Sequence, residues 1–264
     1  MDARRLPPAV LAAASDRAGG ALEVAATALD GLLEVAGAPE LLEEAAAVLE
    51  AGQPAMAPIW HLATAARSPD PPSALTALRA RLVADADAAA DTATAWLLDR
   101  LAAHPGGAHP GAVATVSHSS LVARVLGRVG PARPPDTGAG DTRRPGTGAG
   151  DTRPRRIVGP LHGRVAQPEV EGAGLSTAPV AGVVGADAIG PTALLNADGT
   201  RELAGRVPTL VVATAVKLVP AAVFGRLGGP GFEVVPLEAL AAVAVGSELL
   251  SPAQAGHRAE ELRS

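Results

Sequence analysis

The residue pattern of this chain changes once, at residues 104–107, and this change limits the folds that are open to it. From residue 17 to residue 104, Ala and Leu recur at helical spacing with charged residues between them. After residue 107, short β-branched runs alternate with Gly-containing turns and helix-like segments. We therefore expect an α/β protein with an N-terminal helical domain at 1–104 and a sheet domain at 105–264.

The first part predicts a bundle of three or four helices. One apolar stripe runs from Leu22 to Leu33, another runs from Leu41 to Leu49, and a third helical segment covers 73–103. Turn sequences rich in Gly and Pro separate these segments at 37–39 and 68–72.

The second part predicts a Rossmann-like, mostly parallel sheet that is covered on both faces, because its strands are short and apolar throughout. Strands are expected at 113–116, 157–158, 180–184, 210–212 and 232–235, and helix-like segments at 121–129 and 237–245. In such a sheet a ligand binds at the carboxyl ends of the strands.

Residues 131–156 form a polar stretch in which the seven residues at 137–143 recur at 147–153. The duplicated unit is too short and too poor in apolar residues to be a solenoid repeat. We expect a disordered, solvated insert in the sheet domain. Its Arg residues could hold an anion, but we assign it no function.

Composition excludes several classes of function. With 48% hydrophobic and 19% charged residues among 264, the chain is not disordered throughout. A formal charge of -5 argues against nucleic acid as a partner, because no basic excess exists to neutralise phosphates. The absence of cysteine removes disulfides, thiolate metal sites and thiol nucleophiles together.

Metal, cofactor and membrane motifs are also missing from the sequence. The six His residues are scattered without paired ligand spacing, and Gly228-Gly229 lacks the dinucleotide fingerprint, so no metal and no cofactor are predicted. The most apolar stretch, 207–224, is interrupted by Pro208, Lys217 and Pro220 and is no uninterrupted membrane span. The N-terminal apolar run ends too early for a signal peptide. We expect a cytoplasmic protein without a membrane partner.

A Ser-rich turn follows the strand expected at 113–116. Ser117, Ser119 and Ser120 are placed to cap the next helix, and hydroxyls and free N–H groups at a helix start also suit a phosphate. Ordinary N-capping is the alternative. His118 in the same turn could act as a general base near neutral pH, although a lone His is more often structural.

Two further polar residues follow expected strands. Asp187 comes directly after an apolar run, so its carboxylate would lie near a strand end, where it could bond sugar hydroxyls or move a proton. A carboxylate that caps the next turn is the alternative. Asn196 could bond hydroxyls, or it could be a turn residue beside Asp198-Gly199.

Two cations complete the candidate set. Lys217 is the only lysine of the sequence and lies in an apolar run, where a buried ammonium needs an anionic partner such as a ligand phosphate. A side chain that reaches the sheet edge is the alternative. Arg17 precedes Gly19-Gly20 and could face a phosphate, or it could be a solvated residue at a helix start.

Several segments, in order along the chain, resemble the alpha/beta/delta group of translation initiation factor 2B, whose superfamily includes ribose-1,5-bisphosphate and methylthioribose-1-phosphate isomerases. The clearest is Gly185-Ala186-Asp187 followed by Asn196 and Gly199-Thr200, which resembles a Gly-Ala-Asp…Asn-Lys-x-Gly-Thr pattern. The other matching segments lie at 16–25, 53–59, 115–126, 207–217, 231–236 and 250–252.

The resemblance implies a catalytic role for Asp187, a loose match of Arg17 to a phosphate-facing position, and a homodimer or larger oligomer formed through the C-terminal domain. The chain departs from the family at two positions that matter for catalysis. The family isomerases use a cysteine where this chain has Ser117 or Ser119, and a hydroxyl is a much weaker acid than a thiol. The lysine expected after Asn196 is Ala197. The stretch at 200–207 also looks too short for a crossover helix.

Three functions remain in order of preference. The first is a non-catalytic regulatory protein that binds a sugar phosphate or a nucleoside monophosphate. The second is an aldose–ketose isomerase for a phosphorylated pentose, with Asp187 and His118 exchanging the proton. The third is a module for protein–protein assembly.

Overall fold

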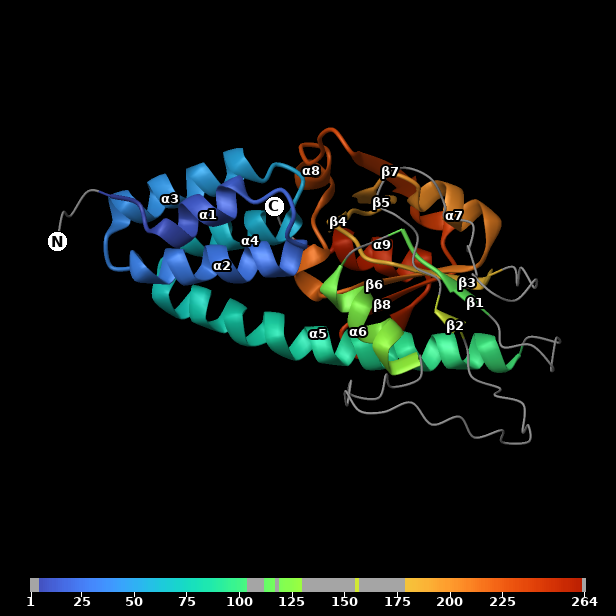
Figure 1. Ribbon diagram of the computed structural model, residues 1–264. Coiled ribbons are helices and arrows are strands. Elements are labelled where there is room, and N and C mark those ends of the chain that lie inside the picture. The colour runs from blue at the N-terminus through green and yellow to red at the C-terminus, as the bar shows by residue number, and fades with distance from the viewer. Residues whose placement is uncertain (1–4, 104–111, 117–118, 130–154, 157–178, 263–264) are drawn as a thin grey trace, which may run out of the picture.

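The structure, a computed structural model, describes residues 5–103, 112–116, 119–129, 155–156 and 179–262. A group of helices lies at one end of the molecule and two β-sheets lie at the other (Figure 1). The long helix α5 (Pro71–Ala102) runs beneath both parts and connects them. A site between the helices and the sheets can therefore take residues from both parts.

Within residues 5–103, which the structure describes, the N-terminal part contains five helices, where the sequence predicted three or four. None of the predicted segments covers α1 or α4, and α1, which follows Pro7 and ends before Asp16, is too short to show a periodic stripe. Asp70 caps the start of α5 by accepting a hydrogen bond from the Ser73 N–H at 3.3 Å. The other bounds are α1 Pro8–Ser15, α2 Ala21–Glu34, α3 Pro39–Gly52 and α4 Ala57–Ala66.

Helix α5 contributes to two cores. Leu75, Leu78 and Leu82 pack with α1–α4, whereas Trp96 and Leu97, in the second half of the helix, pack on the sheet. The division at residue 104 predicted from the sequence stays a prediction, since one helix serves both parts.

The larger sheet has the strand order β2-β1-β3-β6-β8-β9. All neighbouring pairs are parallel except β8 and β9, which are antiparallel. This confirms the predicted α/β class with a mostly parallel sheet. The bounds are β1 Ala112–Ala114, β2 Arg155–Arg156, β3 Pro179–Val184, β6 Thr209–Ala213, β8 Ala242–Val245 and β9 Glu248–Leu250.

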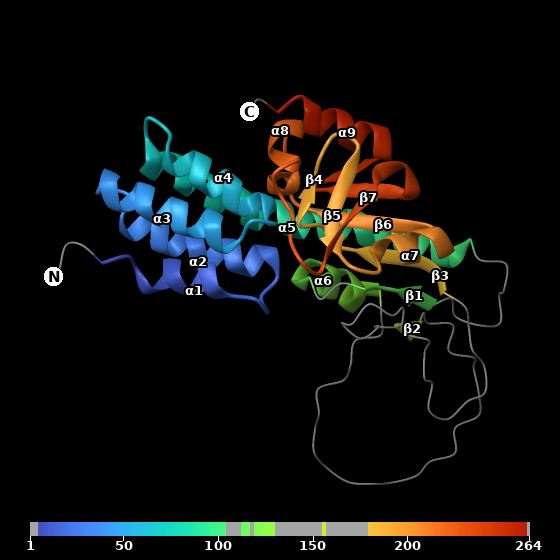
Figure 2. The ribbon, with the colours of Figure 1, turned by 90° about the horizontal axis from the view of Figure 1, so that it is seen from above.

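A second, antiparallel sheet of order β4-β5-β7 was not predicted. It comprises β4 (Ala188–Ile189), β5 (Ala193–Ala197) and β7 (Phe232–Pro236). The strand expected at 232–235 therefore exists, but it pairs with β5 rather than with the parallel sheet. Viewed from above, these strands lie beside the helical part, with α9 (Pro252–Glu260) behind them (Figure 2).

Two predictions about helices are corrected by the structure. The segment 237–245 begins as the 3₁₀ turn η2 (Leu237–Ala239) and continues as strand β8, because its Val residues are buried between β6 and β9. The stretch at 200–207, which looked too short, forms the seven-residue helix α7 (Thr200–Arg206). Gly199 allows this tight start with a φ of 95°.

Other predictions are confirmed or fall outside the described residues. The helix expected at 121–129 is α6 (Ser120–Val129). The remaining short elements are η1 (Ala215–Lys217) and α8 (Ala221–Phe224). The strand expected at 157–158 lies outside the described residues, and so does the insert predicted at 131–156, apart from Arg155 and Arg156. In the described part of the chain, no helix combines the length and the apolar character needed to cross a membrane.

Candidate ligand-binding site

A cavity of about 500 Å³ lies between the helical part and the carboxyl ends of the parallel strands. We call it the strand-end cavity. One wall comes from residues that follow β1, β3 and β6, together with β5 and the segment before β7. The facing wall comes from the α1–α2 connection at 16–22 and the α3–α4 connection at 51–56. Its place agrees with the general rule for ligands of parallel sheets.

Asp187 lies between β3 and β4 and ties the two walls together. Its backbone carbonyl accepts a hydrogen bond from the Ala57 N–H at the start of α4, 3.0 Å away. Its own N–H donates to the Leu195 carbonyl at 2.9 Å. The carboxyl group lines the cavity, and burial raises its pKa, an effect that the nearby Lys217 charge partly offsets.

Lys217 ends the turn η1 and is 5% exposed. Burial lowers the pKa of its ammonium from 10.5 to about 8, while the charges of Asp187 and Glu23 act in the opposite direction. The turn is held by the Asp85 carboxylate, which accepts a hydrogen bond from the Ala215 N–H at 3.3 Å. No carboxylate of the described residues forms an ion pair with Lys217, so its charge is only partly compensated.

Asn196 is a buried residue of β5, not a turn residue. Its Nδ2 donates a hydrogen bond to Thr200 Oγ1 at 2.9 Å, and that hydroxyl donates to the Ala197 carbonyl at 2.8 Å. The amide nitrogen thus holds the start of α7 while the side chain lines the cavity. Asn196 can therefore fix the start of α7 and line the cavity at the same time.

Two side chains, those of Asp16 and Gln53, fix the backbone of the helical wall. Asp16 Oδ1 accepts hydrogen bonds from the N–H groups of Ala18 and Gly19, both at 2.8 Å, and these bonds lower the pKa of the carboxyl. The buried Gln53 donates through Nε2 to the carbonyls of Ala13 and Asp16, both at 2.7 Å. Gln53 therefore joins the α3–α4 connection to the loop after α1.

Arg17 lies on the exposed rim of the same wall. Its guanidinium donates to the carbonyls of Ala14, at 2.9 Å, and Asp16, at 3.1 Å. One of its nitrogens thereby covers the end of α1. The charge stays in contact with solvent, where salt screens it.

The structure brings five of the residues predicted from the sequence to one cavity: Arg17, Ser119, Asp187, Asn196 and Lys217. Ser120 opens α6 and is half-buried, but it does not line the cavity. Ser117 and His118 lie outside the described residues. The ligand contacts and catalytic roles assigned to these side chains stay predictions.

Sequence reasoning missed several residues of the cavity. Gln53 and Met56 belong to the segment at 53–59, which was singled out only because it resembles the initiation factor 2B group. Phe232 was assigned only to a strand. Gln53 could have been predicted as a structural residue, because a polar side chain among buried neighbours must find hydrogen-bond partners. His61, which does not line the cavity but lies close to the segment of Lys217, was also missed. Burial lowers its pKa, and its Nε2 lies 2.9 Å from the Leu218 carbonyl just after Lys217.

Taken together, the cavity offers a buried cation, a carboxyl group of raised pKa and a buried amide on one wall, and a fixed loop with an exposed cation on the other. This combination suits a small anionic guest with hydroxyl groups. Among the residues that the structure describes, no three His, Asp or Glu side chains are grouped so that they could hold a metal ion.

Comparison by sequence gives no match, either to a family model or to a curated protein. Comparison by structure gives clear matches over nearly the whole chain. Translation initiation factor eIF-2B from Pyrococcus horikoshii OT3 superposes with a TM-score of 0.61 at 19% identity, over 94% of this chain and 99% of that one.

Two further structures extend this likeness. The tetrameric eIF2B-beta2-delta2 complex from Chaetomium thermophilum gives a TM-score of 0.59 at 14% identity, over 94% of this chain and 91% of that one. The 5-methylthioribose 1-phosphate isomerase from Pyrococcus horikoshii OT3 gives 0.51 at 14% identity, over 97% and 87%. The chain thus has the α/β fold shared by eIF2B subunits and this isomerase. The resemblance seen in the sequence is confirmed as a likeness of fold.

Proposed function

We propose that this chain binds a sugar phosphate or a nucleoside monophosphate in the strand-end cavity without catalysing a reaction on it, and that occupancy regulates the protein. Lys217 is the observation that carries the proposal. A buried ammonium without an ion-paired carboxylate among the described residues is costly, and a ligand phosphate would compensate its charge.

The rest of the cavity supports the same ligand class. Its volume of about 500 Å³ lies within the range of small-molecule sites. Asp187 and Asn196 offer hydrogen-bond partners for hydroxyl groups. The absence of cysteine from the sequence argues for binding without turnover, because the chain has Ser117 or Ser119 where the similar isomerases use a cysteine, and a hydroxyl is a much weaker acid than a thiol. A ligand that touches both walls would fix the helical part against the sheet, which is how binding would regulate.

A thermal-shift screen tests the proposal. Ribose 5-phosphate, ribose 1-phosphate and AMP at millimolar concentration are expected to raise the melting temperature of the wild-type protein, because a ligand that binds only the folded state stabilises it. Ribose and adenosine serve as matched compounds without phosphate, and they are expected to do less. No stabilisation by any of the phosphorylated compounds would reject the proposal.

A second candidate is an aldose–ketose isomerase acting on a phosphorylated pentose. The raised pKa of Asp187 beside the lowered pKa of Lys217 favours it, since burial moves the pKa of each group in the direction of neutral pH, where proton transfer is most efficient. Incubating pentose phosphates in deuterated water tests it. Neither product nor deuterium incorporation would reject the isomerase for those substrates.

Assembly is the third candidate, with a homodimer or larger oligomer formed through the sheet part. The tetrameric complex among the similar structures supports it. Light scattering on purified protein, with and without AMP, gives the mass of the particle. A monomer under both conditions would contradict assembly and leave ligand binding as the simpler account.

A further inference from the structure

A second cavity, of about 360 Å³, lies between α3, α4 and the α8 segment. We call it the Trp60 cavity. It shares Gln53, Pro54 and Met56 with the strand-end cavity, so the α3–α4 connection separates the two. None of the residues predicted from the sequence to bind a ligand lines it, and its chemistry differs from that of its neighbour.

The lining of the Trp60 cavity combines apolar side chains with the polar or charged Glu50, Gln53, Arg67 and Arg226. Met56 and Ile59 are buried, Val223 and Leu227 close the opposite side, and Trp60 is half-buried. The Trp60 ring stands edge-on to His61, with centroids 4.7 Å apart and planes at 71°. Since His61 is close to the Leu218 carbonyl at 2.9 Å, the ring pair is held in place. Trp60 therefore offers a positioned aromatic surface.

Two of the charged side chains at this cavity already satisfy each other. Arg67 contacts Glu50 at 2.9 Å and Glu43 at 2.8 Å, and both bonds raise its pKa. Glu43 is well exposed, so water screens its charge. Arg67 therefore has little capacity left for a ligand.

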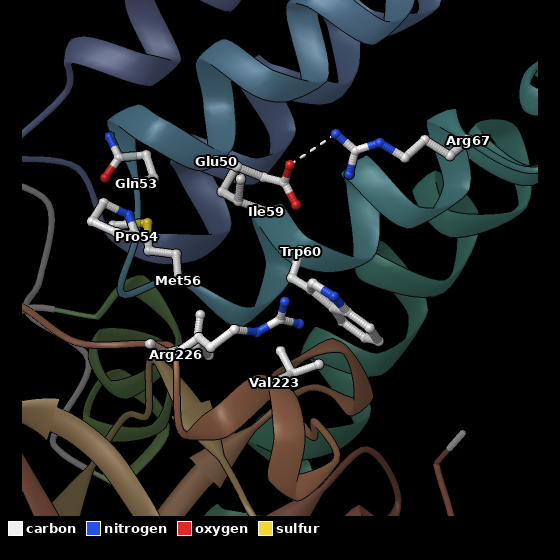
Figure 3. A pocket seen from close by; sticks show the side chains of 10 residues that line it. Glu50, Gln53, Pro54, Met56, Ile59, Trp60, Arg67, Val223 and Arg226 are labelled. Atoms are coloured by element: carbon white, nitrogen blue, oxygen red, sulfur yellow. Dashed lines mark hydrogen bonds and ion pairs between the residues drawn. The ribbon is translucent and has the colours of Figure 1, made fainter. Parts of the chain in front are cut away.

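Arg226 is different. It follows α8, is exposed, and forms no ion pair with any residue of the described segments. Figure 3 shows its side chain extending along the cavity in the direction of Trp60. A guanidinium beside an aromatic surface and aliphatic walls presents two kinds of contact that one ligand can use together.

We propose that the Trp60 cavity binds an organic carboxylate with an aromatic body. The carboxylate pairs with the fork of Arg226, and the ring packs against Trp60 between Met56 and Val223. The volume admits one small ring with a short side chain. A phosphorylated sugar would use the aromatic and aliphatic part of the lining less well, because its ring carries hydroxyl groups where a phenyl ring is apolar.

The first test is titration calorimetry of the wild-type protein with 3-phenylpropanoate, and with 3-phenylpropan-1-ol as the neutral counterpart. The acid is expected to bind with a dissociation constant at least about tenfold lower than the alcohol, because a charge-assisted hydrogen bond is lost with the charge. Equal binding of both compounds, or no binding of the acid at millimolar concentration, would overturn the proposal.

Variants then locate the site. Arg226→Gln is expected to weaken binding of the acid about tenfold, and Arg226→Lys should restore part of it, since a point charge replaces a fork. Arg206→Gln, on the exposed surface of α7 away from both cavities, is the matched control and should bind like wild type. Equal losses in Arg226→Gln and Arg206→Gln would overturn the assignment.

Fluorescence gives a readout that surface attraction alone would not move. The sequence has two tryptophans, so Trp96→Phe leaves Trp60 as the reporter. Its emission is expected to change on addition of 3-phenylpropanoate, and with Arg226→Gln in the same background the change should need about tenfold more ligand. An unchanged emission during binding in Trp96→Phe would contradict contact with Trp60. Lys217→Met should leave this titration unaltered, which separates the proposal from the fate of the phosphate site.

Discussion

The two walls of the strand-end cavity hold their polar groups in different ways. The strand side presents the half-buried Asp187 and the buried Asn196 and Lys217, at the ends of elements whose backbones are fixed by the sheets. The helical side presents a loop that is fixed by Asp16 and Gln53 and carries an exposed Arg17. Burial shifts the pKa of groups on the strand side, whereas the rim cation stays in solvent. Affinity and pH dependence should therefore come from the strand side, and the shape of the cavity from the helical side.

The largest expected effect concerns the stability of the ligand-free protein. Moving the Lys217 pKa from 10.5 to about 8 corresponds to about 3 kcal/mol of destabilisation of the charged form. Between these pH values the unfolded chain holds a proton that the folded protein has released, so stability rises as the pH increases through this window. Urea unfolding between pH 7 and 10.5 measures the rise.

Lys217→Met sharpens this test, because methionine has a similar shape without the charge. The variant is expected to be more stable than wild type at pH 7 and to show no rise between pH 8 and 10.5. A rise of the same size in both proteins would contradict the burial of the ammonium as its cause.

The next largest effect is on ligand affinity. Lys217→Met should weaken binding of ribose 5-phosphate by about 10- to 100-fold, since a charge-assisted contact in a buried site is lost. Calorimetry at pH 7 measures it. Arg17→Gln, on the opposite wall, serves as the comparison. A stronger loss with Arg17→Gln than with Lys217→Met would reverse the roles given to the two walls.

Gln53→Ala is expected to cost about 2 kcal/mol in the free energy of unfolding, because one buried and one partly buried carbonyl lose their shared donor. Ligand affinity should fall as well, since the loop after α1 is released. Chemical denaturation measures the first effect. Gln254→Ala is the control, because that residue caps an exposed helix end and should cost less. Equal costs would argue that the Gln53 bonds do not fix the wall.

The smallest effect is expected for Arg17→Gln, with a change in ribose 5-phosphate affinity of no more than about threefold, because solvent and salt screen an exposed charge. Repeating the titration at low and high salt checks this reasoning. Any loss should shrink at high salt, and a loss that persists there would indicate a direct, desolvated contact.

More residues of the strand side of the cavity than of the helical side were predicted from the sequence. Asp187 follows an apolar run that was expected to be a buried strand, so its place at a strand end followed from the parallel sheet. Lys217 was placed only within an apolar run, where its charge indicated a need for an anionic partner. Asn196 was harder, because β5 and the antiparallel sheet are set by pairing with β7, which lies far along the chain. The segment 237–245 was misassigned for the same reason, since a short apolar run fits a strand or a helix until its neighbours are known.

The helical wall depends on contacts that no local pattern contains. Gln53 bonds to the carbonyl of Ala13, 40 positions away in the sequence, and this pairing exists only once α1 packs on α3. The Trp60 cavity could not be predicted for a similar reason, because Trp60 and Arg226 lie far apart in the sequence. Sequence periodicity predicts which residues lie on one helix face or at one strand end. Which of these residues line a cavity between elements is known only from the tertiary structure.

The central claim is that the strand-end cavity holds a phosphate against Lys217. A crystal structure of the protein with ribose 5-phosphate tests it most directly. The account predicts phosphate oxygens at hydrogen-bond distance, about 2.8 Å, from the Lys217 ammonium, with sugar hydroxyls facing Asp187 and Asn196. A ligand bound elsewhere, with Lys217 still buried and unpaired, would contradict it.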